Sequence, residues 1–489
     1  MEKAKKAPLS KSTYIRGLQC TKSLYLYKNR NFLRDPMPPL QQARLNRGTD
    51  VGELARTLFP GGVDVSPSSP SQLYKSVERT AALVRDDVTT VIYEATFATE
   101  AVLVMTDILV RGERGWIAYE VKSSLKVSET YREDIALQYY VIRKAGLPLE
   151  DIRIIHLDPN YRRKDTLDIR AMLMEESLLG YATERQSLVA DRIQEFIQVI
   201  GAGTSPRIRI GPHCKHPYPC EFQGHCWKSV PSRSVLGLTE LTEEKRFAHF
   251  EKGAQLIGEI IPEEDWTPIQ RSQWAAETEG KHQIIRDDVS LHLKPVNHSS
   301  TFLQLLTSRP AIPLYAGQGA FHPLCIGFGM VKGDEDIPRV VLPEPAEYIP
   351  GDAIMQLVEA LDRIYPIVVY DMEEADYCFH FWEQEHPHLG EKIRNIRSSL
   401  LDIRSLMIRG SLYPCGTQGF NSLASFSAAS GFEELIKLKI NNPSLAGELY
   451  RPLLSGGRHV KGFTLSDIRE FLGTSALTLK TWVNWLKHS

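Results

Sequence analysis

Three consecutive apolar segments, followed by a helix, restrict the fold of this chain more than any other feature of its sequence. The segments 88–98 (VTTVIYEATFA), 101–111 (AVLVMTDILVR) and 115–123 (GWIAYEVKS) are rich in Val, Ile, Thr and Tyr, which favour strands. A glycine-bounded turn at 112–115 joins the last two. Residues 128–146 follow with the pattern of a helix, and 152–159 (IRIIHLDP) with that of a further strand. We therefore expect an α/β sandwich built on an antiparallel meander.

The length predicts more than one domain. Single hydrophobic cores stop growing at about 250–300 residues, and this chain has 489. Its hydrophobic fraction of 42% and charged fraction of 24% are typical of globular proteins. The polar stretch KSVPSRS marks a boundary, so we expect an α/β domain over 1–230, a helical bridging segment over 231–289 and a second α/β domain over 290–489.

Further helices are expected in the first domain. The pattern predicts one short helix over 12–30 that carries Cys20, a second over 42–62 and a third over 70–86. A long helix is predicted over about 172–200. In the second domain, strands are expected at 323–331, 339–343 and 366–371, with a helix over 353–364.

The charge balance excludes recruitment of nucleic acid by a global positive field. Fifty-eight basic and sixty acidic residues give a net charge of −2, so phosphate binding would depend on local patches. Candidate contacts are Arg162, Arg163 and Lys164, with Arg207 and Arg209, although short basic runs are more often solvated surface. No stretch reaches the roughly 18 apolar residues of a membrane span, and we expect a cytoplasmic protein without membrane contact.

Two of the predicted strands carry charges among apolar residues. Asp107 lies near the end of one strand, and Glu120 and Lys122 alternate on the next, so they share a face that a hairpin brings beside Asp107. Mg²⁺ or Mn²⁺ prefers carboxylate oxygens, polarises a phosphoryl oxygen and activates water. Asp107 and Glu120 would be the ligands, with the Val121 carbonyl as a third, and Lys122 would orient the water or stabilise developing charge.

Chance alone often produces such a pattern on a solvated strand face. A functional site is favoured because these carboxylates lie among apolar residues, where burying an unpaired charge costs free energy. Gln138, on the following helix, is a candidate contact to the water or phosphate, and Tyr140 on the same helix a candidate nucleic-acid contact. Glu94, on the preceding strand, is a further candidate metal ligand with weaker support.

Four of the seven cysteines form a second candidate site. Cys214, Cys220 and Cys226 have C-x5-C-x5-C spacing, and Cys20 lies 194 residues earlier. Four thiolates suit a tetrahedral zinc ion or an iron–sulfur cluster, and His213, His216 and His225 are alternative zinc ligands. Cys325, Cys378 and Cys415 are expected to be ordinary small apolar side chains.

Several segments between about 10 and 230 resemble the RecB-like branch of the PD-(D/E)xK superfamily, which includes CRISPR-associated adaptation nucleases and AddB-type exonucleases. They include SKSTYIRGLQCTKSLYLYK, RGTDVGELARTLFPGG, TDIL, YEVKSS and ALQYYV. The resemblance implies a restriction-endonuclease-like core in which Asp107 and Glu120 bind metal, Lys122 is the catalytic lysine and Gln138 the helix glutamine. It favours a [4Fe-4S] cluster on the four cysteines over zinc. Many relatives have a histidine where this chain has Gly52.

The second half resembles an RNase H-like exonuclease domain of the DEDD type. The first motif of that family contains an aspartate and a glutamate, and this chain has Gln304 and Leu306 at the matching positions. In the last motif, Ser475 occupies the position where the family has an aspartate. The acidic residues that remain are Asp371, Glu373, Glu374, Asp376 and Asp402. The resemblance therefore implies a pseudo-exonuclease retained for DNA or partner binding.

We expect a metal-dependent DNA nuclease that acts in phage defence, DNA repair or CRISPR-associated processing, with a helicase or defence protein as partner. Two alternatives stay open. One is a non-catalytic iron–sulfur nucleic-acid-binding scaffold, which the missing histidine favours and the Asp–Glu–Lys pattern opposes. The other is an RNA-directed nuclease or toxin with the same site.

Overall fold

The chain is a mixed α/β protein, and its computed structural model describes residues 7–41, 47–361, 365–417, 422–454, 460 and 462–488. These residues form two units, of which the first ends at Lys228 and the second begins at Ser229. The segment that starts at Pro39 belongs with the second unit, and Ala311–Pro313 with the first. The segment expected to bridge two domains, 231–289, lies within the second unit.

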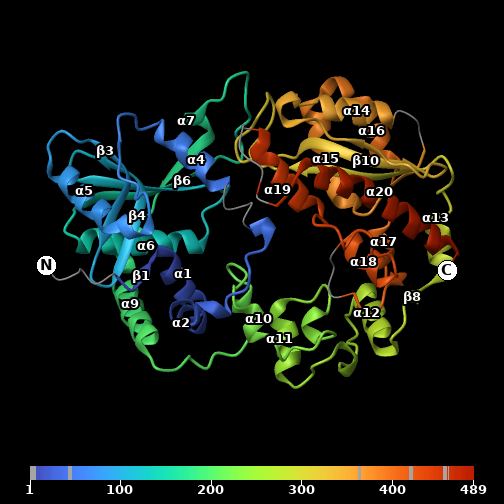
Figure 1. Cartoon of the computed structure of the whole chain (residues 1–489), viewed down its shortest axis with the longest axis horizontal. Helices are drawn as coiled ribbons and strands as arrows, with labels where there is room; N and C mark the ends of the chain where they lie inside the picture. The colour runs from blue at the N-terminus through green and yellow to red at the C-terminus, as the bar shows by residue number, and fades with distance from the viewer. Residues whose placement is uncertain are drawn as a thin grey trace. The chain divides into compact units, whose positions relative to one another are not determined.

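A mixed sheet is the centre of the first unit (Figure 1). Its strands are β1 (Leu9–Ser10), β2 (Val63–Asp64), β3 (Val91–Ala98), β4 (Val102–Arg111), β5 (Trp116–Lys122), β6 (Leu149–Leu157) and β7 (Leu173–Ser177). Their order is β2-β3-β4-β5-β6-β7, with β1 on β4. The predicted antiparallel meander is confirmed for β3, β4 and β5. Strand β6 runs parallel to β5, and β7 antiparallel to β6.

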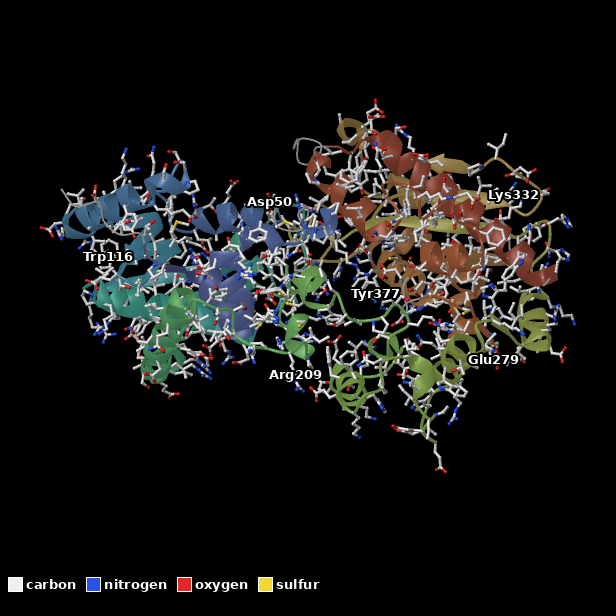
Figure 2. The ribbon with its side chains drawn as sticks, turned by 60° about the horizontal axis from the view of Figure 1, so that its bottom comes forward. Asp50, Trp116, Arg209, Glu279, Lys332 and Tyr377 are labelled. Carbon is white, nitrogen blue, oxygen red and sulfur yellow. The ribbon has the colours of Figure 1, made fainter. Side chains whose placement is uncertain are left out.

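Helices cover this sheet and complete its core. They are α1 (Lys11–Gln19), α2 (Thr21–Asn29), α4 (Arg47–Arg56), α5 (Leu73–Arg85), α6 (Glu129–Lys144), α7 (Ile169–Met172), α8 (Leu179–Glu184), α9 (Gln186–Gly201) and α10 (Gln223–Cys226), with 3-10 turns η1 (Asn31–Leu33), η2 (Pro70–Gln72) and η3 (Pro212–Cys214). Helix α6 packs on β3, β4 and β6 and buries Ile135, Leu137 and Val141. At the start of β5, Trp116, labelled in Figure 2, lies under the Arg111 guanidinium at 4.5 Å.

Two helix predictions in this unit are wrong. The segment 12–30 is two helices, α1 and α2, which meet at an extended Cys20 (φ −164°). The segment expected to be one helix over 172–200 begins instead with β7, because residues Leu173–Ser177 pair with the edge of β6, and helices α8 and α9 follow. Of the predicted helix 42–62, residues 42–46 lie outside the described residues and α4 confirms the central part.

The second unit contains a five-stranded sheet in the order β11-β10-β9-β12-β13. Its strands are β9 (Thr301–Ser308), β10 (Leu324–Lys332), β11 (Arg339–Val341), β12 (Ile367–Val369) and β13 (Leu400–Asp402), and β8 (Gln283–Ile284) pairs separately with β14 (Leu412–Tyr413). Strands β9, β10 and β11 are antiparallel to one another, whereas β12 runs parallel to β9 and β13 parallel to β12.

Helices pack on both sides of this second sheet, as two separate apolar clusters indicate. The helices of the second unit are α11 (Glu243–Glu251), α12 (Pro268–Glu279), α13 (Arg286–Leu293), α14 (Asp352–Ala360), α15 (Met372–Glu385), α16 (Gly390–Ser398), α17 (Arg404–Ile408), α18 (Leu423–Ala429), α19 (Pro443–Leu454) and α20 (Leu465–His488), with 3-10 turns η4 (Val235–Gly237), η5 (Ile257–Glu259), η6 (Pro345–Glu347) and η7 (Pro387–Leu389). In the described part of the chain, no helix has both the length and the apolar character to cross a membrane.

Candidate active site

The candidate site lies where the edge of β4 changes partners. Strand β1 pairs with the start of β4, through Val102 and Leu103. Strand β5 pairs with the end of β4, from Ile108 onward. Between these two ladders the backbone of β4 is available to side chains, and Asp107 lies there, with its Oδ2 accepting a hydrogen bond of 2.6 Å from the Val121 N–H. A side chain thus replaces the next bond of the β4–β5 ladder.

Glu120 is the centre of the site and is almost fully buried, with 3% of its side chain exposed. Its Oε1 accepts hydrogen bonds from two ammonium groups, Lys122 Nζ at 2.6 Å and Lys11 Nζ at 2.7 Å. Its Oε2 accepts one from Gln138 Nε2 at 2.9 Å. The structure therefore brings together the sequence-predicted Asp107, Glu120, Lys122 and Gln138.

Helix α6 completes the cluster with a residue that sequence reasoning missed. Asp134 lies one turn before Gln138, and its Oδ2 is 3.0 Å from Lys122 Nζ and 3.8 Å from Lys11 Nζ. Ser128 caps the start of α6. The signal for Asp134 was its i, i+4 spacing to Gln138, which places both on one helix face.

The two central carboxylates are shifted in opposite directions. Burial, with the negative charge of Glu120, raises the pKa of Asp107 to about 7. Burial would also raise the pKa of Glu120, but the charges and hydrogen bonds of Lys11 and Lys122 outweigh it and lower that pKa to about 2. The pKa of Lys122 is raised by its carboxylate partners despite its burial. Glu120 is thus held ionised, whereas for Asp107 the positive charge of Lys11 does not outweigh burial and the charge of Glu120.

An unpaired acceptor supports the presence of a further group. Gln138 Oε1 is buried and, among the described residues, receives no hydrogen bond. Buried acceptors are normally satisfied by protein or ordered water. A cation carrying water between Asp107 and Glu120 fits this donor set, since Mg²⁺ and Mn²⁺ prefer carboxylate oxygen and keep several waters. In the described part of the chain, however, no three His, Cys, Asp or Glu side chains are already grouped as a metal site.

Glu94 lies on β3 beside the site but is paired with another residue. It has a positive φ of 55°, a rare backbone conformation for a residue other than glycine. Its Oε1 accepts from Arg56 Nη2 at 2.6 Å. Arg56 ends α4, and Gly52 lies one turn earlier on the same helix. Burial raises the pKa of Glu94, against the effect of Arg56.

The predicted nucleic-acid contacts are not all near this cluster. Tyr140 is two residues beyond Gln138 and so faces away from it, where Lys144 Nζ lies 5.8 Å from its ring. Arg162, Arg163 and Lys164 follow β6 at the end of the sheet where Lys122 ends β5. Arg162 Nη1 donates to the Pro159 and Tyr161 carbonyls, and Arg163 Nη1 to the Pro313 carbonyl.

Tyr218 is an aromatic residue near the site that sequence reasoning missed. Tyr218, half exposed, lies in the loop between Cys214 and Cys220. Burial and the Tyr131 hydroxyl raise the pKa of Tyr218. The charge of Asp134 raises it further, and the charge of Lys122 lowers it. The Tyr131 ring lies 5.2 Å from Lys122 Nζ. The cysteine loop therefore borders the carboxylate cluster, which no local sequence signal indicated.

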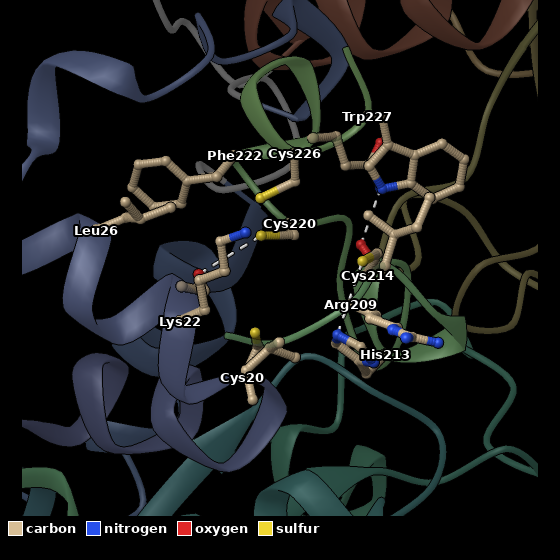
Figure 3. A pocket seen from close by; sticks show the side chains of 14 residues that line it. Cys20, Lys22, Leu26, Arg209, His213, Cys214, Cys220, Phe222, Cys226 and Trp227 are labelled. Carbon is tan, nitrogen blue, oxygen red and sulfur yellow. Dashed lines mark hydrogen bonds between the residues drawn. The ribbon is translucent and has the colours of Figure 1, made fainter. Parts of the chain in front are cut away.

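The four predicted cysteines line one cavity (Figure 3). Cys20 enters from the α1–α2 junction, Cys214 from η3, Cys220 from the loop and Cys226 from α10. The Cys220 N–H donates to the Cys214 carbonyl at 2.9 Å and closes the loop. Glu221 is held by ion pairs from both Arg16 and Arg34. Segments nearly 200 residues apart thus share one thiol-lined space.

The chemistry of this cavity fits a thiolate-bound metal group. Burial raises the pKa values of Cys20 and Cys226, so both thiols carry protons in the absence of a cation. Thiolate ligands must lose these protons when metal binds. Leu26, Ile208 and Phe222 add apolar walls. Of the alternative zinc ligands, His213 lines the cavity. His216 and His225 are absent from its lining.

No protein-family model matches this chain, and no curated protein matches it either.

Proposed function

We propose that the first unit is a metal-dependent nuclease of the PD-(D/E)xK class, of the RecB-like kind, that cleaves DNA. The observation that carries the proposal is the buried cluster of Asp107, Glu120, Lys122 and Gln138 on neighbouring elements. Charged groups at this depth are costly, and they are retained most readily where function needs them. The antiparallel meander followed by α6 and a parallel β6 also supports a restriction-endonuclease-like core.

Each residue of the cluster would have a separate role in phosphodiester hydrolysis. Asp107 and Glu120 would hold Mg²⁺ or Mn²⁺, which when bound polarises the phosphoryl oxygen and acidifies water. Lys122, fixed between Glu120 and Asp134, points a positive charge at the same point and stabilises the charge that develops on phosphate. Gln138 holds Glu120 through its amide and offers its free Oε1 to a water. The basic loop at 162–164 and Tyr218 would contact the nucleic-acid strand.

The four cysteines would hold a [4Fe-4S] cluster, with zinc as the alternative. Their role would be structural, because they join the α1–α2 junction to the last loop of the unit. The loop that they fix carries Tyr218 to the edge of the carboxylate cluster, so the group would shape the substrate entrance without taking part in hydrolysis.

The second unit would be an RNase H-like pseudo-exonuclease. Three antiparallel strands followed by two parallel ones support that fold. Gln304 and Leu306 stand on β9 where carboxylates would be required, and Leu306 is fully buried. Asp371 forms an ion pair of 2.7 Å with Arg404. A two-metal site needs several converging carboxylates, so we expect Asp402→Ala to leave cleavage within a few fold of wild type.

The test is digestion of labelled single- and double-stranded DNA and RNA by anaerobically purified protein with Mn²⁺. Asp107→Ala, Glu120→Ala and Lys122→Ala should each abolish cleavage while the circular dichroism spectrum stays native. Wild-type rates in all three variants would disprove the assignment. Preference for RNA would support the alternative of an RNA-directed nuclease or toxin.

One observation favours the non-catalytic scaffold as a second candidate. The lysines already satisfy Glu120 Oε1, and Gly52 stands where relatives have a histidine ligand. A protein that binds DNA without Mn²⁺ and never cleaves it would support that function.

A further inference from the structure

The site contains a second lysine that no motif assigned. Lys11 follows β1 directly and begins α1. The pairing of β1 with β4 and the cap that Ser10 makes on α1 fix its backbone beside the gap in the β4 edge. Its ammonium group reaches into that gap, 3.2 Å from the Met105 carbonyl and 2.7 Å from Glu120 Oε1. A quarter of the Lys11 side chain is exposed, whereas only 3% of the Glu120 side chain is.

A structural ion pair with Glu120 does not by itself explain the position of the Lys11 ammonium group. Glu120 already has Lys122 at 2.6 Å on the same oxygen, and bringing a second ammonium group there adds lysine–lysine repulsion. Lys11 instead occupies the approach to the two carboxylates from the side where β4 has no strand partner.

The charge balance of the cluster limits the number of metal ions. When ionised, Asp107, Glu120 and Asp134 supply three negative charges, and Lys11 and Lys122 supply two positive charges. Glu94 is left out of this count because its Oε1 is paired with Arg56, which also pairs with the more exposed Asp64. One divalent cation brings the total from −1 to +1, whereas two would bring it to +3 in a largely buried space. The donors present therefore favour one divalent ion.

We propose that Lys11 is a catalytic residue that takes the place of a second divalent cation: its ammonium group contacts the scissile phosphate while one metal ion is held by Asp107 and Glu120. This inference rests on the proposed nuclease function. In a site with one metal ion, a fixed ammonium group supplies a second positive charge that stabilises the negative charge developing on the phosphate. No second ion then has to bind.

The test measures Mn²⁺ binding by electron paramagnetic resonance and cleavage at saturating Mn²⁺. Wild type should bind one ion at this site, and Glu120→Gln should lose it. Lys11→Met should bind Mn²⁺ about tenfold more tightly or take up a second ion, because a repelling charge is removed. The same variant should cleave roughly a hundredfold more slowly, the scale expected when one electrostatic stabiliser is lost.

Lys11→Arg and Lys75→Met complete the design. Arg keeps the charge, so Mn²⁺ affinity should return to the wild-type value even if cleavage recovers only in part. Lys75, exposed on α5, provides a charge-matched control that should change neither readout. If Glu120→Gln loses Mn²⁺ but Lys11→Met binds and cleaves like wild type, Lys11 is not the second cation and the nuclease proposal stands. If wild type and Glu120→Gln bind Mn²⁺ alike, the metal site itself is refuted, and this inference with it.

Discussion

Glu120 and Asp107 are neighbouring carboxylates whose negative charges have opposite effects on the free energy of unfolding. Glu120 balances two ammonium groups, so Glu120→Gln leaves Asp134 as their remaining described carboxylate partner. The substitution should lower the free energy of unfolding by about 2 kcal/mol, less than for a fully buried pair because both lysines are partly exposed. Asp107→Asn should raise that free energy at pH 8, because the amide still accepts from Val121 and a costly charge is removed. Urea unfolding without added divalent cations measures both. Equal destabilisation by the two substitutions would contradict this account.

Asp402 predicts a pH dependence in the second unit. Burial, with the nearby Asp371, raises its pKa from 3.8 to about 6, despite hydrogen bonds from the Met372 and Arg404 N–H groups. Between these two values the folded chain holds a proton that the unfolded chain has released, so stability falls as pH rises through this window. Asp402→Asn keeps an acceptor oxygen but cannot titrate. The difference in urea midpoint between variant and wild type should therefore grow in the variant's favour from pH 4.5 to pH 7.5, and a constant difference would refute the shift.

Some site residues were visible in the sequence and others were not, for a physical reason. Asp107, Glu120 and Lys122 interrupt apolar strands, and Gln138 follows on the next helix, so local pattern suffices. Lys11 is 109 residues from its partner Glu120, and its neighbours are ordinary polar residues of a helix start. Only the pairing of β1 with β4 places it in the site, and a two-residue strand leaves no periodic signal.

Helix α4 allows a test of whether a histidine at position 52 can bind the metal ion. A Cβ atom added to Gly52 meets no atom within 4 Å, and Arg56, one turn later on the same helix, already reaches Glu94 beside the site. Gly52→His should therefore be tolerated and should raise Mn²⁺ affinity about tenfold, the effect of roughly one pK unit of added interaction. Calorimetric titration with Mn²⁺ measures this.

Gly52→Ala is the matched control for the histidine variant. It removes the glycine from the helix, which should stabilise α4 by about 0.5–1 kcal/mol, but it adds no ligand. Equal Mn²⁺ affinity in the alanine and histidine variants would mean that α4 does not face the metal site.

The elements that sequence pattern predicted correctly are those whose burial is set locally. Strands β3 to β6 and helix α6 have long apolar periodicities and were predicted within a few residues. Strand β7 was predicted as helix because Leu173–Ser177 is short and mostly exposed, and only the free edge of β6 makes it a strand. The break at Cys20 was missed because both flanking segments have helical composition, so the extended residue depends on tertiary context.

At the scale of the whole molecule, the two units should respond differently to loss of the cysteine group. Cys20 stands at the junction of α1 and α2, and Cys214, Cys220 and Cys226 stand at the end of the same unit. A metal group shared by the four would therefore close a loop of about 200 residues. Closing a loop of this length removes several kcal/mol of chain entropy from the unfolded state, by analogy with a cross-link, and metal binding adds directly to folding free energy. The second unit has its own sheet and core and contains none of these four cysteines.

We therefore expect Cys20→Ser to lower the unfolding temperature of the first unit and to remove its bound iron or zinc, while the second unit unfolds as in wild type. Cys415→Ser should change neither, because Cys415 belongs to the second unit, beside Glu277 and Arg233, and does not line the thiol-lined cavity. Differential scanning calorimetry with elemental analysis measures both properties in the full chain. Brown protein that absorbs near about 400 nm would identify the group as iron–sulfur, and colourless protein with one zinc ion would identify zinc. If Cys20→Ser retains full metal content and both transitions, the four cysteines do not bind one group. The loop that carries Tyr218 must then be held by protein contacts, such as the ion pairs of Glu221 and the hydrogen bonds from Gln19 Nε2 to the His213 and Tyr218 carbonyls.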